Sequence, residues 1–75
     1  MNYRNNFSDR ISALRKCKGI SLAALGMQLG VTDEAIRLLE KGKRSPSFEI
    51  LIALADYFDV SLDYLVGRSD DPARH

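Results

Sequence analysis

The chain has 75 residues, a length that accommodates one domain, residues 1–75. Its composition, 45% hydrophobic and 28% charged, excludes a wholly disordered chain. Cys17 is the only cysteine and His75 the only histidine, which excludes an intramolecular disulfide, a Cys/His metal cluster and a histidine-based triad. Because no spacing places a base next to a nucleophile, we expect no enzyme, no metal and no cofactor.

The sequence carries no signal for a membrane or for export. No apolar run approaches the roughly 20 residues that span a bilayer, and the first ten residues lack the apolar core of a signal peptide. We therefore expect a cytoplasmic protein with no membrane partner.

Charge is distributed unevenly along the chain, although the net charge is only +1. Residues 1–20 carry five basic side chains against one acid, residues 21–44 carry four against three, and residues 45–75 carry two against six. Such a layout favours one face for a polyanion and another face that points away from it.

Five short helices are predicted in chain order, so the expected fold class is all-α. Each begins at a hydroxyl residue that can cap a helix N-terminus: Ser8, Ser21, Thr32, Ser47 and Ser61. Each is followed by a residue suited to the left-handed conformation of a C-cap: Gly19, Gly30, Gly42, Asp59 and Gly67. Residues 1–5 and 69–75 are expected to be frayed ends.

Apolar residues recur at helical intervals and predict the core. The first three helices contribute Phe7, Ile11, Leu14, Leu22, Leu25, Leu29, Ile36 and Leu39. The fourth contributes an inward stripe of Phe48, Leu51, Leu54, Ala55 and Phe58, and the fifth contributes Leu62, Leu65 and Val66. A second stripe on the fourth helix, Ile50, Ala53 and Tyr57, either widens the core or forms a partner surface.

The most informative segment runs from Leu22 to Leu39. Two helices of about eight residues meet at Gly30-Val31-Thr32, a turn too short for them to lie antiparallel. A three-to-four-residue turn with glycine, joining helices at a large angle, is the helix-turn-helix motif. Gly26 supplies the small residue that a close crossing needs, and the motif is expected over about residues 22–41.

Several motifs in the right order give a family resemblance over residues 7 to 67. They are G-x-S before the second helix, LG-V-T at its turn, I-x-x-L-E-x-G-K-R-x-P after it, and V-S-L-D-Y-L-x-G at the end. Together they resemble the Cro/C1-type helix-turn-helix domain, also called the XRE family. The resemblance implies a lambda-repressor-like DNA-binding domain with the motif in the second and third helices.

The resemblance also implies a function and its residues. The protein is expected to be a repressor-like transcriptional regulator that binds a palindromic double-stranded DNA operator as a homodimer, with recognition helices about 34 Å apart. The matching base-contact positions on the third helix, about residues 33–41, are Asp33, Glu34, Arg37 and Leu38. The matching phosphate contacts are Ser21, Lys41, Lys43, Arg44 and Ser45.

Other residues carry structural roles in the family. An arginine late in the first helix pairs with a glutamate at the end of the third, which corresponds to Arg15 and Glu40 here. The C-terminal helices form the dimer interface, which assigns Tyr57, Leu62, Tyr64 and Val66 to it.

The sequence departs from the family pattern at positions that matter for DNA. Leu22 stands where glutamine is usual, and Leu38 where a polar or basic residue is common. Asp33 and Glu34 can accept a hydrogen bond from cytosine, or can simply stabilise the helix N-terminus. These departures support an alternative: a protein-interaction module or antitoxin that keeps the fold, binds DNA weakly and has a protein antagonist or toxin as partner.

Overall fold

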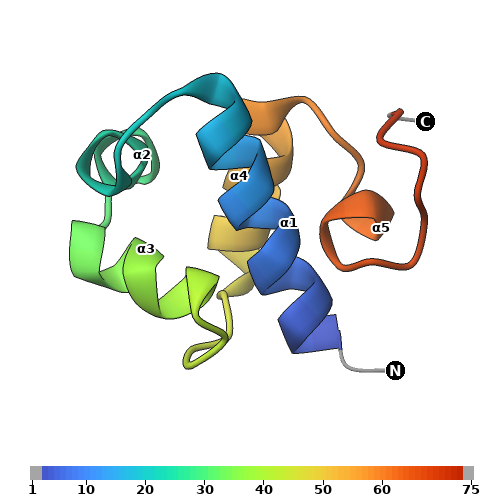
Figure 1. The fold of residues 1–75 in the computed structure, drawn as a ribbon, viewed down its shortest axis with the longest axis horizontal. Coiled ribbons are helices and arrows are strands. Elements are labelled where there is room, and N and C mark those ends of the chain that lie inside the picture. Colours follow the sequence, from blue (N-terminus) through green and yellow to red (C-terminus); the bar gives the residue numbers. More distant parts are fainter. Residues whose placement is uncertain (1–2, 74–75) are drawn as a thin grey trace.

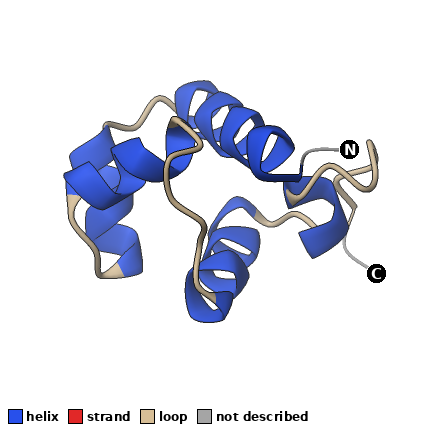
Figure 2. Cartoon of the chain, turned by 90° about the horizontal axis from the view of Figure 1, so that it is seen from below, coloured by secondary structure: helices blue, strands red, loops and turns tan. Residues whose placement is uncertain are grey.

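The computed structural model describes residues 3–73. Its elements are α1 (Tyr3–Lys18), α2 (Leu22–Leu29), α3 (Asp33–Glu40), α4 (Phe48–Phe58) and α5 (Leu62–Leu65). Residues 3–73 contain no strand, as Figure 2 shows. The predicted all-α fold class with five helices is therefore confirmed.

Two central helices separate a pair of helices at one end of the molecule from a single short helix at the other. Figure 1 shows α2 and α3 together at one end of the molecule and α5 at the other, with α1 and α4 between them. Helix α1 contacts both α3 and α5, and α4 contacts both α2 and α5. The two central helices thus connect α2 and α3 to the far end of the domain.

Local hydrogen bonds explain where four of the helices begin. The side-chain oxygens of Ser21, Thr32, Ser47 and Ser61 each accept a hydrogen bond from the backbone N–H three residues later, at 3.0 to 3.2 Å. The first N–H groups of a helix lack partners within the helix, so these hydroxyls satisfy one of them. These four predicted N-caps are confirmed.

The predicted helix ends are also confirmed, and one of them is unusual. All four glycines expected at C-caps have φ between 72° and 81°. The fourth helix ends instead at Asp59, with φ 55°, a conformation that costs a residue with a Cβ more than it costs glycine. Bonds from the backbone N–H groups of Asp59 and Val60 to the carbonyls of Asp56 and Ala55 hold this turn.

The prediction that Ser8 caps the first helix is wrong. Helix α1 begins at Tyr3, inside the segment expected to fray, and Ser8 lies within it, almost fully buried. The Ser8 hydroxyl donates a hydrogen bond of 2.7 Å to the backbone carbonyl of Leu39. The last carbonyls of a helix lack intrahelical partners, so Ser8 caps the end of α3 rather than the start of α1.

One apolar core holds the helices together. Its buried side chains come from all five helices and the α4–α5 turn: Phe7, Ile11, Leu25, Ile36, Leu39, Leu54, Ala55, Val60 and Leu65. Ile50 and Tyr57 of the second stripe pack against this cluster and so widen the core. The prediction that Phe48 points inward is wrong: 71% of Phe48 is exposed, because it lies with Ile52 on the outer face of α4, whereas Ile50 and Leu51 pack against the core.

The C-terminal tail folds back on the domain as far as it is described. The backbone N–H of Ser61 donates to the carbonyl of Pro72 at 3.0 Å, and Arg10 forms an ion pair with Asp70 at 2.9 Å. Residues 1–2 and 74–75, which include His75, lie outside the described residues. Within residues 3–73, every helix is too short or too polar to cross a lipid bilayer.

Candidate nucleic-acid interface

The turn between α2 and α3 lies close against α2 because Gly26 has no side chain. A Cβ at this position would lie 2.7 Å from the carbonyl oxygen of Val31 and 3.2 Å from that of Thr32. The N–H of Val31 also donates to the carbonyl of Gly26 at 2.9 Å. Gly26 thus lies at a close approach, as predicted, but its neighbour is the backbone of the turn that leads into α3 rather than α3 itself.

Helix α3 has two faces of different character. Ile36 and Leu39 are buried in the core, and Leu38 is half-buried. Asp33 and Glu34 are exposed, and Arg37 is half-exposed along the same outer face. Of the four predicted base-contact residues, three therefore present charged groups to solvent, and Leu38 presents a partly covered apolar one.

The charged groups on α3 bond to each other. The Asp33 carboxylate accepts from the backbone N–H of Glu34 at 2.9 Å, a contact that satisfies one free N–H of the first turn. Glu34 and Arg37 form an ion pair one helical turn apart: Nε of Arg37 donates to Oε2 of Glu34 at 3.2 Å, and Nη2 donates to Oε1. Sequence reasoning missed this pair, although its i,i+3 spacing is one that allows contact on a helix.

The loop after α3 carries the predicted phosphate contacts. It begins with a reversal in which Gly42 has φ 72°, its N–H donates to Leu39, and the N–H of Lys43 donates to Leu38. Lys41, Lys43 and Arg44 are exposed, and Ser45 is exposed beside them. The reversal thus places three cations directly after the exposed face of α3.

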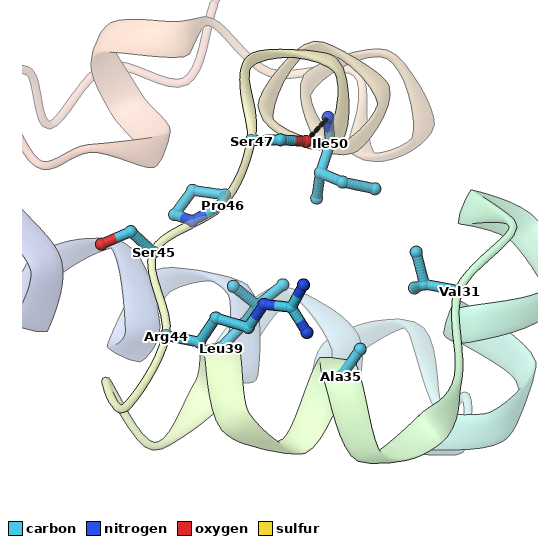
Figure 3. Close-up of a pocket in the computed structure, with 8 residues that line it drawn as sticks. All are labelled: Val31, Ala35, Leu39, Arg44, Ser45, Pro46, Ser47 and Ile50. Carbon is cyan, nitrogen blue, oxygen red and sulfur yellow. Dashed lines mark hydrogen bonds between the residues drawn. The ribbon is translucent and has the colours of Figure 1, made fainter.

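A small cavity of about 60 Å³ lies between α3, this loop and α4 (Figure 3). Its walls are Val31, Ala35, Leu39, Arg44, Ser45, Pro46, Ser47 and Ile50. Figure 3 shows the Arg44 side chain directed into the space that Val31 and Ile50 also face. A cavity of this size is far below the several hundred Å³ of a small-molecule pocket, so we do not expect it to bind a ligand. It matters here because the Arg44 side chain lies in it.

Ser21, the remaining predicted phosphate contact, caps α2. Its oxygen accepts from the N–H of Ala24 at 3.0 Å, and the residue is exposed. Leu22 beside it packs against the core and offers no polar group. The first turn of α2 therefore presents the Ser21 hydroxyl and backbone N–H groups.

The expected Arg15–Glu40 pair is present in the structure and joins α1 to α3. Nε of Arg15 donates to Oε2 of Glu40 at 2.6 Å, Nη2 donates to Oε1 at 3.2 Å, and Nη1 donates to the carbonyl of Ile20 at 2.8 Å. The side chains are 14% and 9% exposed. The hydrogen bond with Glu40 raises the pKa of Arg15, burial opposes this, and the charge of Glu40 adds to the rise.

The residues predicted for a dimer interface lie on α4 and at α5, and two of them already have partners. The ring of Tyr57 lies under the ammonium group of Lys18 at 4.9 Å, and that of Tyr64 lies under the guanidinium of Arg10 at 4.1 Å. Val66 is half-buried, and Leu62 is 38% exposed.

A further apolar surface lies on α4, and it includes Ala53 of the second stripe but otherwise differs from the partner surface that the sequence suggested. Phe48 and Ile52 are exposed. They line a shallow hollow together with Glu49, Ala53 and Asp56. Their spacing of four residues places Phe48 and Ile52 on one helix face.

The geometry of α2, its short turn and α3, with a charged outer face on α3 and cations after it, defines a helix-turn-helix domain. The helix-turn-helix family model matches residues 11–65, and the chain belongs to this family, in its Cro/C1-type (XRE) form. The matched relatives are transcription regulators rather than enzymes, which confirms the prediction that the protein is not an enzyme.

Two relatives show the extent of the likeness. The HTH-type transcriptional regulator AnsR of Bacillus subtilis is 43% identical over 60 residues, which cover 80% of this chain and 52% of AnsR. The crystal structure of the Salmonella phage P22 c2 repressor in complex with a synthetic operator is 41% identical, with a TM-score of 0.75 over 79% of this chain and 89% of that one.

The restriction-modification controller protein C.AhdI of Aeromonas hydrophila is similar over 85% of this chain and 96% of its own, with 27% identity and a TM-score of 0.75. The chain spans between 52% and 59% of the length of the first three curated relatives it matches, all regulators of B. subtilis.

Proposed function

We propose that residues 1–75 act as a sequence-specific, double-stranded DNA-binding domain of a repressor-like transcriptional regulator in the cytoplasm. The observation that carries the proposal is the arrangement of α3: its outer face is charged, and Lys41, Lys43 and Arg44 follow it on a tightly turned loop. The likeness to a repressor in complex with a synthetic operator supports it further.

In this proposal, α3 lies in the major groove and the groups around it bind the backbone. Asp33, Glu34, Arg37 and Leu38 face base edges. Phosphates are bound by Ser21, Lys41, Lys43, Arg44 and Ser45. Arg44 leaves the cavity beside α3 to reach its phosphate. Phosphate contacts set the register and supply most of the affinity, whereas the few groups on α3 select the sequence.

The proposed binding unit is a homodimer on a palindromic operator. Exposed Leu62 with Tyr57, Tyr64 and Val66 forms its interface, on α4 and at α5, away from the charged face of α3. Two copies then place their recognition helices one turn of DNA apart, about 34 Å.

Fluorescence anisotropy with the duplex upstream of the protein's own gene tests the proposal. We expect that duplex to bind more tightly than a scrambled one, and the affinity to fall steeply with salt, since each neutralised phosphate releases counterions. Lys43→Ala should reduce both the affinity and its salt dependence. If the upstream duplex binds no better than the scrambled one, and a selection from random duplexes enriches no sequence, the proposal is wrong.

The alternative function is a protein-interaction module with a protein antagonist or toxin as partner. The exposure of Phe48 and Ile52 on one face of α4 favours it. A pull-down that captures one protein with the wild-type chain and loses it with Phe48→Ser, combined with weak, salt-insensitive DNA binding, would support this function over the first.

A further inference from the structure

We propose that Glu34 and Arg37 work as one reading unit in which Glu34 is a positioning residue and Arg37 contacts a guanine in each operator half-site. The inference rests on the proposed function, because it assumes that α3 enters the major groove. It goes further by assigning different roles to the two residues and by naming the base.

The first step is the geometry of the guanidinium. Four of its five N–H groups form two flat forks: one from Nε and Nη2 along the side, and one from Nη1 and Nη2 at the end. Glu34 bonds to Nε and Nη2, so it occupies the side fork. The end fork has no acceptor among residues 3–73, and the Arg37 side chain is 41% exposed, so this fork is open to a partner.

The second step is the match between this end fork and a base. Guanine presents two acceptors in the major groove, O6 and N7, at the spacing of two parallel N–H donors. Adenine presents one acceptor and one donor at the same edge, so its amino group opposes the second N–H. A guanidinium held by its side fork therefore selects guanine over adenine.

The third step concerns charge. A lone carboxylate on the outer face of α3 would be repelled by the phosphates on both sides of the groove. Paired with Arg37, Glu34 belongs to a unit with no net charge, and both of its oxygens already accept hydrogen bonds. Asp33 is turned to the helix N-terminus, where it bonds to the N–H of Glu34. Neither acid is thus arranged as an independent reader of cytosine.

The test is selection from a pool of random duplexes with the wild-type chain, Glu34→Gln, Arg37→Lys and the control Glu49→Gln. Glu49 is also an exposed glutamate on a first helical turn, but it lies on α4. Arg37→Lys keeps the charge and loses the fork, so its preference for guanine at one position should fall about tenfold or more. Glu34→Gln cannot accept both bonds, and preference at that same position should fall roughly fivefold while other positions keep theirs.

A spectroscopic measurement follows the pair without DNA. In the free protein, Glu34→Gln should shift the Nε–H resonance of Arg37 and leave that of Arg15 in place, since Arg15 bonds to a different glutamate. An unchanged Arg37 resonance would overturn the pairing on which the inference depends.

The selection separates the inference from the proposed function. The reading unit is wrong, and DNA recognition stands, in two cases in which the wild type enriches a sequence. In the first, Glu34→Gln leaves the preference at every position unchanged. In the second, Glu34→Gln relaxes only a cytosine position that Arg37→Lys does not affect. If the wild type enriches no sequence, both fail. A guanine position that both variants relax and Glu49→Gln does not would establish the unit.

Discussion

Two arginines in this domain bind a glutamate in the same way but in opposite surroundings. Arg15 and Arg37 each use Nε and Nη2 to bond to both oxygens of a carboxylate. The Arg15–Glu40 side chains are 14% and 9% exposed, and the Arg37–Glu34 side chains are 41% and 57% exposed. Arg15 also bonds to Ile20 through Nη1, so all three of its side-chain nitrogens donate within the domain.

The difference shows what surroundings do to one chemical arrangement. Removing one member of a buried pair leaves a charge away from water, whereas an exposed charge is re-solvated at once. The buried pair therefore sets the position of α3 on α1, and the exposed pair is available for a partner. Four substitutions test this contrast, in order of decreasing effect on stability.

Glu40→Ala should have the largest effect, because it leaves the largely buried Arg15 guanidinium without its carboxylate. We expect a loss of about 3 kcal/mol in the free energy of unfolding. For a domain of this size that lowers Tm by roughly 10–20 °C. Thermal unfolding followed by circular dichroism measures it, and a Tm within a few degrees of the wild type would contradict the structural role of the pair.

The pH dependence of this effect has a definite sign. The folded-state pKa of Arg15 is raised, so its stabilising contribution is complete below the unfolded-state pKa and is lost only as the pH rises through the folded-state value. Both lie far above neutrality. Arg15 therefore stays charged between neutral and mildly alkaline pH. We expect the difference in Tm between wild type and Glu40→Ala to stay the same over this range.

Gly26→Ala tests whether the buried side of α3 depends on close packing as well as on charge. Alanine favours a helix by about 1 kcal/mol over glycine, but here its Cβ would lie 2.7 Å from a backbone oxygen that has to move. We expect a net loss of about 2 kcal/mol, typical of overpacking. Gln28→Ala, at an exposed position of α2, is the control; greater stability of Gly26→Ala would show that the crossing has room.

Ser8→Ala removes a neutral hydrogen bond from the same buried side. The carbonyl of Leu39 also accepts from the N–H of Gly42 at 3.2 Å, so it keeps one partner. We expect a loss of about 1 kcal/mol, measured by chemical denaturation. Ser12→Ala, on the same helix, provides the comparison, and equal effects of the two changes would contradict a special role for Ser8.

Glu34→Ala should have the smallest effect, although it removes the same type of pair as Glu40→Ala. An i,i+3 ion pair on an exposed helix face contributes about 0.2–0.5 kcal/mol, and at ordinary salt a solvent-exposed carboxylate in the first turn adds about 0.3 kcal/mol, so the total loss stays below about 1 kcal/mol. The loss should shrink at high salt. A decrease in stability as large as that of Glu40→Ala would remove the contrast between the two pairs.

Local signals predicted most of the fold. Four N-caps and all the left-handed C-caps follow from hydrogen bonds between residues close in sequence, and Ser21 and Gly30 are examples. Ser8 resembles them in sequence, but its acceptor lies 31 residues away on another helix, so no local pattern could assign it. Phe48 has the spacing of an inward residue, but it lies with Ile52 on the exposed face of α4, and this depends on how the helix is turned against the core.

The candidate interface was predictable in part for the same reason. The sequence identified α3, and the resemblance identified the Arg15–Glu40 pair, because both depend on motifs. Whether Arg37 stood alone or bonded to Glu34 depends on rotamers that the sequence does not specify. The spacing of Glu34 and Arg37 permitted the pair without requiring it.

The position of the two described chain ends has a practical consequence for experiments. Helix α1 begins at Tyr3 near α5, and the tail up to Ala73 also lies there, on the opposite side of α1 and α4 from α3 (Figure 1). A fluorescent dye attached at Ala73 would sit on the opposite side of the domain from α3. Labelled protein should therefore report its encounter with a duplex without the label competing for the same surface.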